Sequence, residues 1–424
     1  MSMRRRVVIS STLGNALEWF DFTIFGLMAL VISKLFFPSE NASTALLKTF
    51  ATFGVAFVAR PLGGLLFGLY ADRFGRKKAL VFMIALMAVG TGMIGVLPTY
   101  AQVGLLAPML ILVARLIQGI SAGGEFGSAS AMLIEFAPPG QRGLYGSSQS
   151  VSQTLAFILG GLCGYALNQN LTPQQLESWG WRIPFLLGIL IGPVGYFVRH
   201  QVDESPIFQR HLQQGNRPEQ APLQTLMRRH RRALLTTFCL TAAATAITYV
   251  TAIYLPAYAA QQLGLPLAQA QLGLIGASCI SLVLAPVSGA LSDRWGRRTV
   301  ILPTLLAFSL LFYLAMHRLV AQPDLHHLWT VQAVGALLGF LVGPMPALMT
   351  EIFPVQVRST GASLMYNLAV MLFGGLAPAL NTALVKSSGD PLVPAYYVAF
   401  ASLVGVVGLL ALPGASADDE KTFE

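Results

Sequence analysis

The sequence predicts an all-α membrane protein with twelve transmembrane helices in two six-helix halves. Three observations predict this fold class. Only 11% of the 424 residues are Asp, Glu, Lys or Arg, whereas a soluble globular protein carries about 25%. Apolar runs long enough to cross a bilayer recur along the whole chain. Two charged motifs of the first half are repeated in the second half.

The apolar runs define the individual spans, since a transmembrane helix needs about 20 such residues. We expect twelve spans, at residues 10–36, 48–72, 78–98, 103–131, 144–168, 180–200, 231–259, 266–292, 298–318, 327–350, 359–384 and 393–413. A long polar interruption separates the sixth run from the seventh. The predicted parts are therefore an N-terminal half (1–200), a cytoplasmic linker (201–230), and a C-terminal half with a short cytoplasmic tail (231–424).

The placement of Lys and Arg predicts the orientation. With the N-terminus in the cytoplasm, 20 of the 27 basic residues fall in cytoplasmic segments, five fall outside, and Arg60 and Arg115 lie within spans. Cytoplasmic loops typically carry such an excess. Both termini are therefore expected in the cytoplasm, and the chain is expected to cross the cytoplasmic (inner) membrane many times. The excess of basic residues in cytoplasmic segments explains the net charge of +9, so no nucleic-acid partner is expected. The protein is expected to lie in the lipid bilayer. We also expect it to be a monomer.

Two motifs recur about half a chain apart. Asp72-Arg73-Phe-Gly75-Arg76-Lys77 returns as Asp293-Arg294-Trp-Gly296-Arg297-Arg298, and Glu135-x-x-Pro138-x-x-x-Arg142 returns as Glu351-x-x-Pro354-x-x-x-Arg358. Parallel repeats of this kind are typical of transporters that rock one half against the other around a central site. The first motif resembles the signature loop of the major facilitator superfamily, and the resemblance covers essentially the whole chain.

Further motifs resemble the metabolite:proton symporters within that superfamily. These are Gly14-Asn15-Ala-Leu-Glu18-Trp-Phe-Asp21-Phe, Arg60-Pro61-Leu-Gly63-Gly64, Arg115-Leu-Ile-Gln118-Gly119, and Trp179-Gly-Trp181-Arg182-Ile-Pro184-Phe. The segment Leu-Ala-Pro378-Ala-Leu-Asn381-Thr-Ala-Leu-Val-Lys386 resembles the citrate-transporting members in particular. The resemblance implies the major facilitator fold and transport of a small metabolite together with protons.

The resemblance also implies a latch that joins the halves on the cytoplasmic side and breaks in the inward-open state. Its expected residues are Asp72, Arg73, Arg76, Asp293, Arg294, Arg297, Glu135, Arg142, Glu351 and Arg358. Ordinary anchoring of basic residues at the cytoplasmic surface is the alternative interpretation. The acid-plus-turn pattern occurs in both halves, which favours the latch.

Charged residues within spans are functional candidates, because burial of a charge in a membrane is costly. Arg60 and Arg115 lie near the midplane, where their guanidinium groups suit a carboxylate substrate. Glu18 and Asp21 share a helix face, and with Glu125 they are the candidate proton-coupling carboxyls. The alternative is structural ion pairing, such as Asp21 with Arg60 or Glu125 with Arg115.

The C-terminal half offers neutral groups instead. Between residues 233 and 292 there is no Asp, Glu, Lys, Arg or His. We therefore expect ion handling in the N-terminal half and neutral hydrogen bonds from the other half. With Arg60 and Arg115, the candidate substrate-binding residues are Asn15, Gln118, Gln149, Gln153, Tyr249, Tyr254 and Asn367. Hydrogen bonds between helices are the alternative role for Gln149 and Gln153.

These observations predict a secondary transporter that imports an organic di- or tricarboxylate with protons by alternating access, with citrate as the first candidate. Itaconate, tricarballylate, another dicarboxylate, shikimate or a betaine-like compound are alternatives. A transporter-like membrane sensor and a passive channel are alternatives of a different class. The sequence contains no phosphate-binding loop and no hydrolase motif, so it predicts neither an enzyme nor a metal site. No cofactor is expected beyond the co-transported proton, for which sodium is the alternative ion.

Overall fold

The computed structural model describes residues 3–74, 76–123, 130, 133–134, 137–189, 230–353 and 358–411. All the regular secondary structure within these ranges is helical. The predicted linker therefore lies outside the described residues, except for His230. The division into residues 1–200, 201–230 and 231–424 remains a prediction. Below, "first half" means the described residues up to 189, and "second half" means those from 230 onwards.

The helices of the first half follow the predicted spans. They are α1 (Met3–Leu27), α2 (Ala29–Phe36), α3 (Ala42–Phe74), α4 (Arg76–Val96), α5 (Tyr100–Val103), α6 (Leu106–Ala122), α8 (Arg142–Asn170), α9 (Pro173–Gln175), the π-helix η1 (Leu176–Gly180) and α10 (Arg182–Gly188). The sixth predicted span is described only in its first part. The first predicted span is not one straight helix, because α1 and α2 meet at a bend of 67°.

The second half contains the remaining six predicted spans, two of which include π-helical turns. Its elements are α14 (Arg231–Thr248), η2 (Tyr249–Tyr254), α15 (Leu255–Gln262), α16 (Leu267–Trp295), α17 (Arg297–Ala321), α18 (Leu325–Gly335), α19 (Leu338–Val342), α20 (Met345–Glu351), α21 (Arg358–Ala369), η3 (Val370–Gly375), α22 (Ala377–Ser388) and α23 (Val393–Leu410). The seventh span is α14–η2–α15, and the eleventh is α21–η3–α22. Such π-helical turns often occur at functional sites.

The described helices satisfy the length and composition of membrane spans. Eight helical segments of the described chain are long and apolar enough to cross a bilayer, and the bent pair α1–α2 makes nine. Two shorter apolar helices, Val81–Val96 and Leu106–Ala122, correspond to the third and fourth predicted spans. With α10 at the start of the sixth, every predicted span has a helical counterpart. The twelve-helix prediction is therefore confirmed as a fold.

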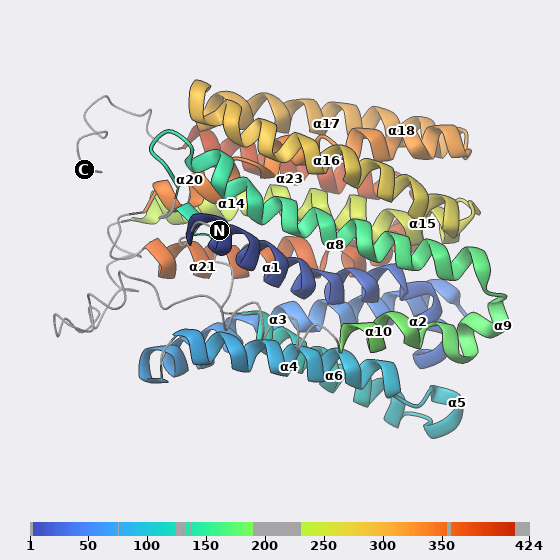
Figure 1. The fold of residues 1–424 in the computed structure, drawn as a ribbon. Coiled ribbons are helices and arrows are strands. Elements are labelled where there is room, and N and C mark those ends of the chain that lie inside the picture. Colours follow the sequence, from blue (N-terminus) through green and yellow to red (C-terminus); the bar gives the residue numbers. More distant parts are fainter. Residues whose placement is uncertain are drawn as a thin grey trace.

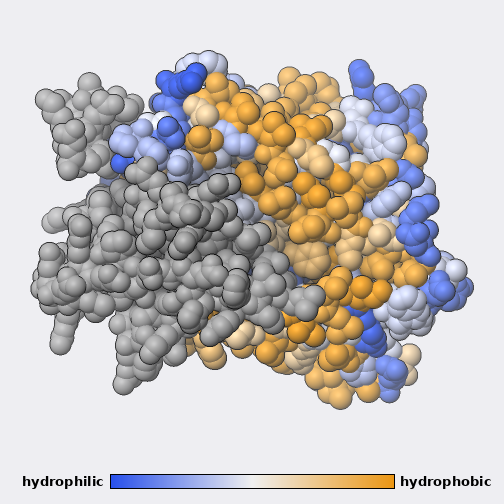
Figure 2. Space-filling model, viewed as in Figure 1, coloured by the Kyte–Doolittle hydropathy of each residue, from blue (hydrophilic) through white to orange (hydrophobic). Residues whose placement is uncertain are grey.

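The helices run side by side, with their ends at two opposite edges of the molecule (Figure 1). Large apolar side chains face outwards along the middle of the bundle, including Leu65, Val283 and Val407, which are 61%, 62% and 66% exposed. Figure 2 shows a broad hydrophobic surface there, with hydrophilic residues gathered at its right-hand edge. An apolar surface of this extent is unfavourable in water and is typical of contact with lipid.

The two halves meet along two main contacts. Helix α8 of the first half packs along α16 of the second half, and α3 packs against η3 and α22. Within the first half, α3 packs closely on α6 because Gly119 and Gly123 face the backbone of Ala56 and Arg60. Small residues permit such close helix packing in membranes. This contact brings the helix that carries Arg60 next to the helix that carries Arg115.

Candidate functional site

Arg60 of α3 and Arg115 of α6 lie buried at the centre of the bundle. Their side chains are 2% and 0% exposed. The ring of Phe22 from α1 lies between them, with its centroid 4.9 Å from the Arg60 guanidinium carbon and 5.1 Å from that of Arg115. A cation over an aromatic ring is stabilised by the electrons of the ring face. This ring therefore helps to hold two positive charges in a buried site.

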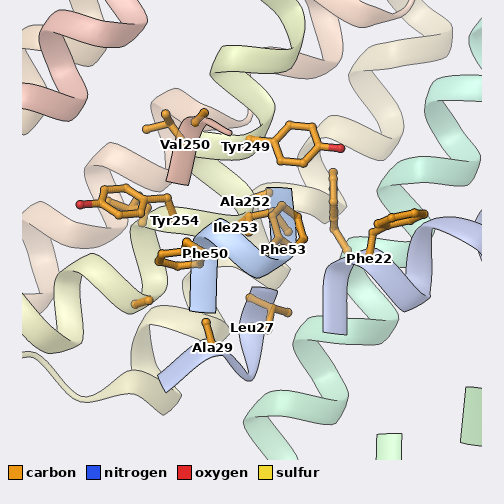
Figure 3. Packing of buried hydrophobic residues seen from close by; sticks show 14 of the residues in the cluster. Phe22, Leu27, Ala29, Phe50, Phe53, Tyr249, Val250, Ala252, Ile253 and Tyr254 are labelled. Carbon is orange, nitrogen blue, oxygen red and sulfur yellow. The ribbon is translucent and has the colours of Figure 1, made fainter. Parts of the chain in front are cut away.

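Further aromatic rings enclose the two guanidinium groups. Trp19 and Phe57 lie 5.6 and 5.0 Å from Arg60, and Phe25 and Phe53 lie 4.5 and 5.1 Å from Arg115. Tyr249 of η2 adds a ring from the second half, 5.4 Å from Phe57. Figure 3 shows Phe22, Phe53 and Tyr249 converging where these helices meet. We call the set the aromatic cage: Trp19, Phe22, Phe25, Phe53, Phe57 and Tyr249.

Each arginine retains an unused donor inside the cage. Arg60 Nη2 donates to Glu18 Oε1 at 3.3 Å, and Arg115 Nη2 donates to the Phe53 carbonyl at 3.1 Å. Among the described residues, neither Arg60 Nε nor Arg115 Nε has a hydrogen-bond acceptor. A buried donor without an acceptor is unfavourable. An anionic ligand that accepts a hydrogen bond from Nε would therefore stabilise either arginine.

The carboxyl groups of α1 have different partners. Glu18 forms the ion pair with Arg60, whereas the structural alternative considered from the sequence paired Asp21 with Arg60. Asp21 is fully buried and accepts a hydrogen bond from the Thr91 hydroxyl of α4. The Thr91 oxygen accepts from Gln118 Nε2 at 2.8 Å, and Gln118 Oε1 accepts from Arg115 Nη1 at 2.7 Å. Asp21 is thus linked to Arg115 through two neutral side chains.

The predicted residues Asn15 and Gln149 bind one another. Gln149 Nε2 donates to Asn15 Oδ1 at 3.1 Å, and Asn15 Nδ2 donates to Ser152 Oγ at 2.5 Å. These bonds join α1 to α8. In this arrangement the two amides serve the contact between helices, which was the alternative role considered for Gln149.

Gln153 lines a small cavity on the other side of η2 from Tyr249. Its volume is about 30 Å³, room for about one or two water molecules. The cavity lies between α8, η2, α16, α18 and α19, and its polar lining comprises Gln153, Thr154, Thr251, Ser278, Ser281 and Gln332. The two arginines enclosed by the aromatic cage do not line this cavity. Any ligand group in the cavity would therefore meet neutral hydrogen-bonding groups.

The other candidates from the second half take separate positions. Tyr254 packs against Phe50 and Tyr258, away from the arginines. Asn367 donates to the Gly123 carbonyl at 3.1 Å and so connects α21 with the end of α6. Tyr366, beside it in sequence, is buried and interacts with Arg60. The second half therefore reaches the cage through Tyr249 and Tyr366.

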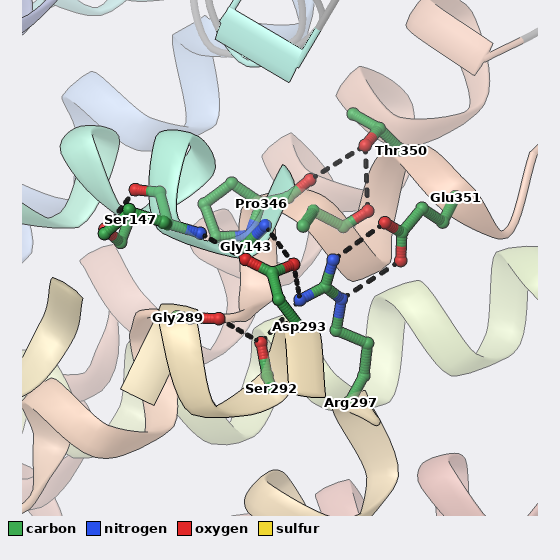
Figure 4. Close-up of polar contacts among 11 residues, drawn as sticks. Gly143, Ser147, Gly289, Ser292, Asp293, Arg297, Pro346, Thr350 and Glu351 are labelled. Carbon is green, nitrogen blue, oxygen red and sulfur yellow. Dashed lines mark hydrogen bonds and ion pairs between the residues drawn. The ribbon is translucent and has the colours of Figure 1, made fainter. Parts of the chain in front are cut away.

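The second copy of the charged motif joins the two halves at one end of the bundle (Figure 4). Asp293 at the end of α16 accepts from the backbone N–H groups of Gly143 and Leu144 at 2.8 and 3.0 Å. These groups begin α8, where a carboxylate is favoured by unpaired N–H groups and the helix dipole. Arg297 bonds to Asp293 at 2.8 Å and to Glu351 at 2.9 Å.

The same contact requires glycine at the start of α8. A Cβ atom at Gly143 would collide with the Gly289 carbonyl oxygen and with the Arg297 guanidinium.

At the opposite end of the bundle, Asn168 donates to Gln271 at 3.2 Å and Lys386 donates to Thr44 at 2.6 Å. Contacts between the halves therefore exist at both ends of the described bundle.

Several predicted residues are not located by these contacts. Glu125 and Glu135 lie outside the described residues, as do the side chains of Asp72, Arg73, Arg76 and Arg358. Arg294 is exposed. With the other described residues, neither Arg294 nor Arg142 forms an ion pair.

Sequence reasoning missed Thr91 and all the aromatic cage except Tyr249. Thr91 is a single neutral residue in an apolar span, which gives no pattern to recognise. The aromatic residues did carry a signal. Trp19, Phe22 and Phe25 are spaced by three, and Phe50, Phe53 and Phe57 by three and four, so each set shares one helix face.

Twelve helices around a buried charged centre, with charged contacts between the halves at one end, define a membrane transporter rather than an enzyme. Two family models match the chain, "Sugar (and other) transporter" over residues 7–221 and "Major Facilitator Superfamily" over residues 237–422. The chain belongs to the major facilitator superfamily. This confirms the resemblance found in the charged motifs.

Individual relatives match nearly the whole chain. A citrate-proton symporter of Salmonella typhi is 38% identical and the alignment covers 96% of this chain and 93% of the relative; one of Klebsiella pneumoniae is 36% identical over 94% and 90%. A proline/betaine transporter of Salmonella typhimurium is 33% identical over 95% and 82%. The crystal structure of a D-xylose-proton symporter superposes with a TM-score of 0.75 over 95% and 97% of the two chains, at 19% identity, which supports the fold.

Proposed function

We propose that this transporter is a proton-coupled symporter that imports an organic di- or tricarboxylate, with citrate as the first candidate substrate. The observation that carries the proposal is the pair of buried arginines in one aromatic cage, each with an Nε group that lacks an acceptor among the described residues. The names of the two citrate-proton symporters that resemble the chain support the same substrate class.

The cage favours a multiply charged anion. Arginine binds carboxylates through two parallel hydrogen bonds and stays charged at physiological pH. Because the two guanidinium groups share the Phe22 ring, two carboxylates of one molecule could bind at neighbouring positions. Both guanidinium groups are buried, and a low local dielectric strengthens such charge-assisted bonds.

The proline/betaine relative supplies the competing candidate. Aromatic cages bind quaternary ammonium groups through their ring faces. Here, however, Phe22, Phe25 and Phe57 each have a guanidinium group over the ring. The quaternary ammonium group of a betaine would find these ring faces already occupied, and the two guanidinium groups would repel it. The described geometry therefore favours a carboxylate over a betaine.

Proton coupling follows from the charge balance of the cage. Glu18 and Asp21 oppose Arg60 and Arg115, so with both acids ionised the site has little net charge left for an anion. Proton binding to either acid restores positive charge where a carboxylate binds, and leaving an anion unbalanced in a buried site is costly. Substrate and protons would therefore enter together.

Alternating access would use the contacts between the halves. The bonds from the Gly143 and Leu144 N–H groups to Asp293 hold one end closed, and Arg297 pairs with Asp293 and Glu351 beside them in a charged cluster. Asn168–Gln271 and Lys386–Thr44 hold the other end. Opening either set exposes the cage to one side. We propose that the charged cluster faces the cytoplasm, in accord with the distribution of basic residues.

Purified protein in liposomes tests the proposal. With an inwardly directed proton gradient, labelled citrate should accumulate, and a protonophore should abolish the accumulation. Unlabelled tricarballylate, itaconate, other dicarboxylates, shikimate, proline and betaine then compete in parallel, and a sodium gradient replaces the proton gradient in a further arm. Accumulation of proline or betaine without citrate would contradict the proposal, as would gradient-independent flux of all solutes.

A further inference from the structure

Thr91 occupies the middle of an unbroken chain of hydrogen bonds in the described structure. The chain begins at the Arg115 guanidinium, passes through the Gln118 amide and the Thr91 hydroxyl, and ends at the Asp21 carboxylate. The four side chains come from α6, α4 and α1 and are all 0% exposed. Although both residues are described, Asp21 and Arg115 form no direct ion pair.

Every link in this chain has the same polarity. Arg115 can only donate and a carboxylate can only accept, so Gln118 must present its oxygen to Arg115 and its amino group to Thr91. With Asp21 ionised, the Thr91 hydroxyl accepts from Gln118 and donates to Asp21. The order of donors is therefore fixed by the charges at its two ends.

The Thr91 hydroxyl has a second acceptor within reach. Its oxygen lies 3.0 Å from the carbonyl oxygen of Met87, one turn earlier in α4. A hydroxyl has one proton and can accept two hydrogen bonds. It can therefore donate either to Asp21 or to Met87, and in either case still accept from Gln118.

We propose that Thr91 is a positioning residue that couples the protonation of Asp21 to the orientation of Arg115 by switching its hydroxyl between these two acceptors. The proposal rests on the proton-coupled function above. When Asp21 takes up a proton, its new O–H donates to the Thr91 oxygen, and the Thr91 proton turns to the Met87 carbonyl. In either state, the Thr91 hydroxyl therefore donates one hydrogen bond and accepts one from Gln118.

The switch changes the force on Arg115. With Asp21 ionised, a negative charge lies at the far end of the chain and stabilises the present orientation of Gln118 and Arg115. With Asp21 neutral, that attraction is lost, and the guanidinium is held by neutral acceptors, Gln118 Oε1 and the Phe53 carbonyl. Arg115 is then freer to turn towards a substrate carboxylate.

The surroundings of Asp21 contain few other ionisable groups. Glu18 shares its helix, Arg115 faces it from α6, and Arg60 and Tyr249 lie across the cage. From α10 the nearest position is Gly188, where a Cβ atom would lie 3.0 Å from Asp21 Oδ1. Among the described residues, Thr91 is the hydrogen-bond partner of the Asp21 carboxyl.

Thr91→Val tests the proposal because it removes the hydroxyl and keeps the branched shape. The carboxylate loses the bond that stabilises its charged form, so the pH of half-maximal citrate uptake in liposomes should rise by about one to two units. Uphill accumulation should fall, while citrate exchange at equal pH is largely retained. Thr91→Ser keeps the hydroxyl and should restore the parent pH profile.

Thr49→Val is the matched control. Thr49 of α3 is equally buried, and its hydroxyl donates to the Ala45 carbonyl at 3.0 Å in the same helix. It should leave both the pH profile and accumulation as in the parent. Gln118→Leu interrupts the chain one link later, and should also reduce uphill accumulation, because Asp21 is then no longer linked to Arg115.

A second readout does not depend on the substrate. Infrared difference spectra of the purified protein, recorded over a pH titration, contain the C=O stretch of protonated carboxyl groups, and the Asp21 band is the one lost in Asp21→Asn. Thr91→Val should shift its frequency and its titration midpoint, and Thr49→Val should shift neither.

The two readouts separate the proposals. Absence of citrate uptake by the parent protein would overturn the proposed function, while the infrared titration would still decide the role of Thr91. If Thr91→Val matches Thr49→Val in the infrared titration, or if Thr91→Ser fails as completely as Thr91→Val, the switch is wrong.

Discussion

The first half of the chain buries Glu18, Asp21, Arg60 and Arg115 at its centre, whereas the second half has no Asp, Glu, Lys, Arg or His between residues 233 and 292. The second half instead brings neutral groups, such as the Tyr249 hydroxyl and the amides and hydroxyls of the cavity beside Gln153. Both halves nevertheless have six predicted spans and the same charged motif.

This difference indicates a division of roles between two similar bundles. In the proposed function, the proton and the substrate carboxylates bind to the charged residues at the centre of the first half. The second half can tune affinity and selectivity through hydrogen bonds and shape. Since η2 and η3 lie in its seventh and eleventh spans, it also contains the irregular turns at which helices adjust.

The largest expected effect comes from Arg115. Arg115→Ala should weaken citrate binding about 10- to 100-fold, since a hydrogen bond to a charged group contributes about 1.5–3 kcal/mol. The citrate affinity of Arg115→Lys should lie between that of the parent protein and that of Arg115→Ala, because lysine keeps the charge but lacks the paired donors. Calorimetry on the purified variants measures this, with exposed Arg318→Ala as the control. Unchanged affinity in both Arg115 variants would remove Arg115 from the anion site.

The acids of α1 should affect coupling more than binding. Glu18→Gln and Asp21→Asn imitate the protonated state, so each should still exchange citrate across the membrane. Neither should concentrate it against a gradient, because no proton can be released on the inner side. If both variants accumulate citrate with the parent pH dependence, coupling lies elsewhere, and Glu125 is the next residue to change.

The contact between Asp293 and the start of α8 should affect conformation without changing citrate affinity. Asp293→Asn weakens its bonds to the start of α8 by about 1–2 kcal/mol, which changes the ratio of closed to open forms of this end of the bundle about 5- to 30-fold. Distances between spin labels at this end report the shift. Asp324→Asn is the control, because Asp324 caps the start of α18. This variant should leave the distances between the spin labels unchanged.

The smallest effect should come from the second half. Tyr249→Phe removes a hydroxyl that has no hydrogen-bond partner among the described residues, so citrate affinity should change by about threefold or less. The pH profile should stay that of the parent protein, as measured by uptake at a series of external pH values. A lost pH dependence would show that the neutral half takes part in coupling.

The fold was largely predictable from the sequence. A bilayer requires long apolar runs, so hydropathy alone located the spans, and the repeated motif near Asp72 and Asp293 indicated the two related halves. The bend between α1 and α2 was not predictable. Gly26, just before it, packs against Ile253 of the second half, so a contact between distant segments accompanies the bend, and no local pattern encodes it.

The centre of the site was predictable only in part. Arg60, Arg115 and Asp21 stand out because charges are rare in apolar spans, and the structure brings all three into one cluster. Which acid pairs with which base depends on helix rotation, so Glu18 rather than Asp21 contacts Arg60. Thr91 gains its position only when α4 packs beside α1 and α6.

The backbone contact at Gly143 has a consequence for how the closed state is selected. At this point α8 and α16 meet so closely that a single methyl group at residue 143 has no room. Closure therefore depends on the absence of atoms there as much as on the attraction between Asp293 and its partners. A small side chain at residue 143 should therefore shift the balance from the closed form of this end towards the open form. It would do so by steric repulsion alone, because every charge in the protein stays in place.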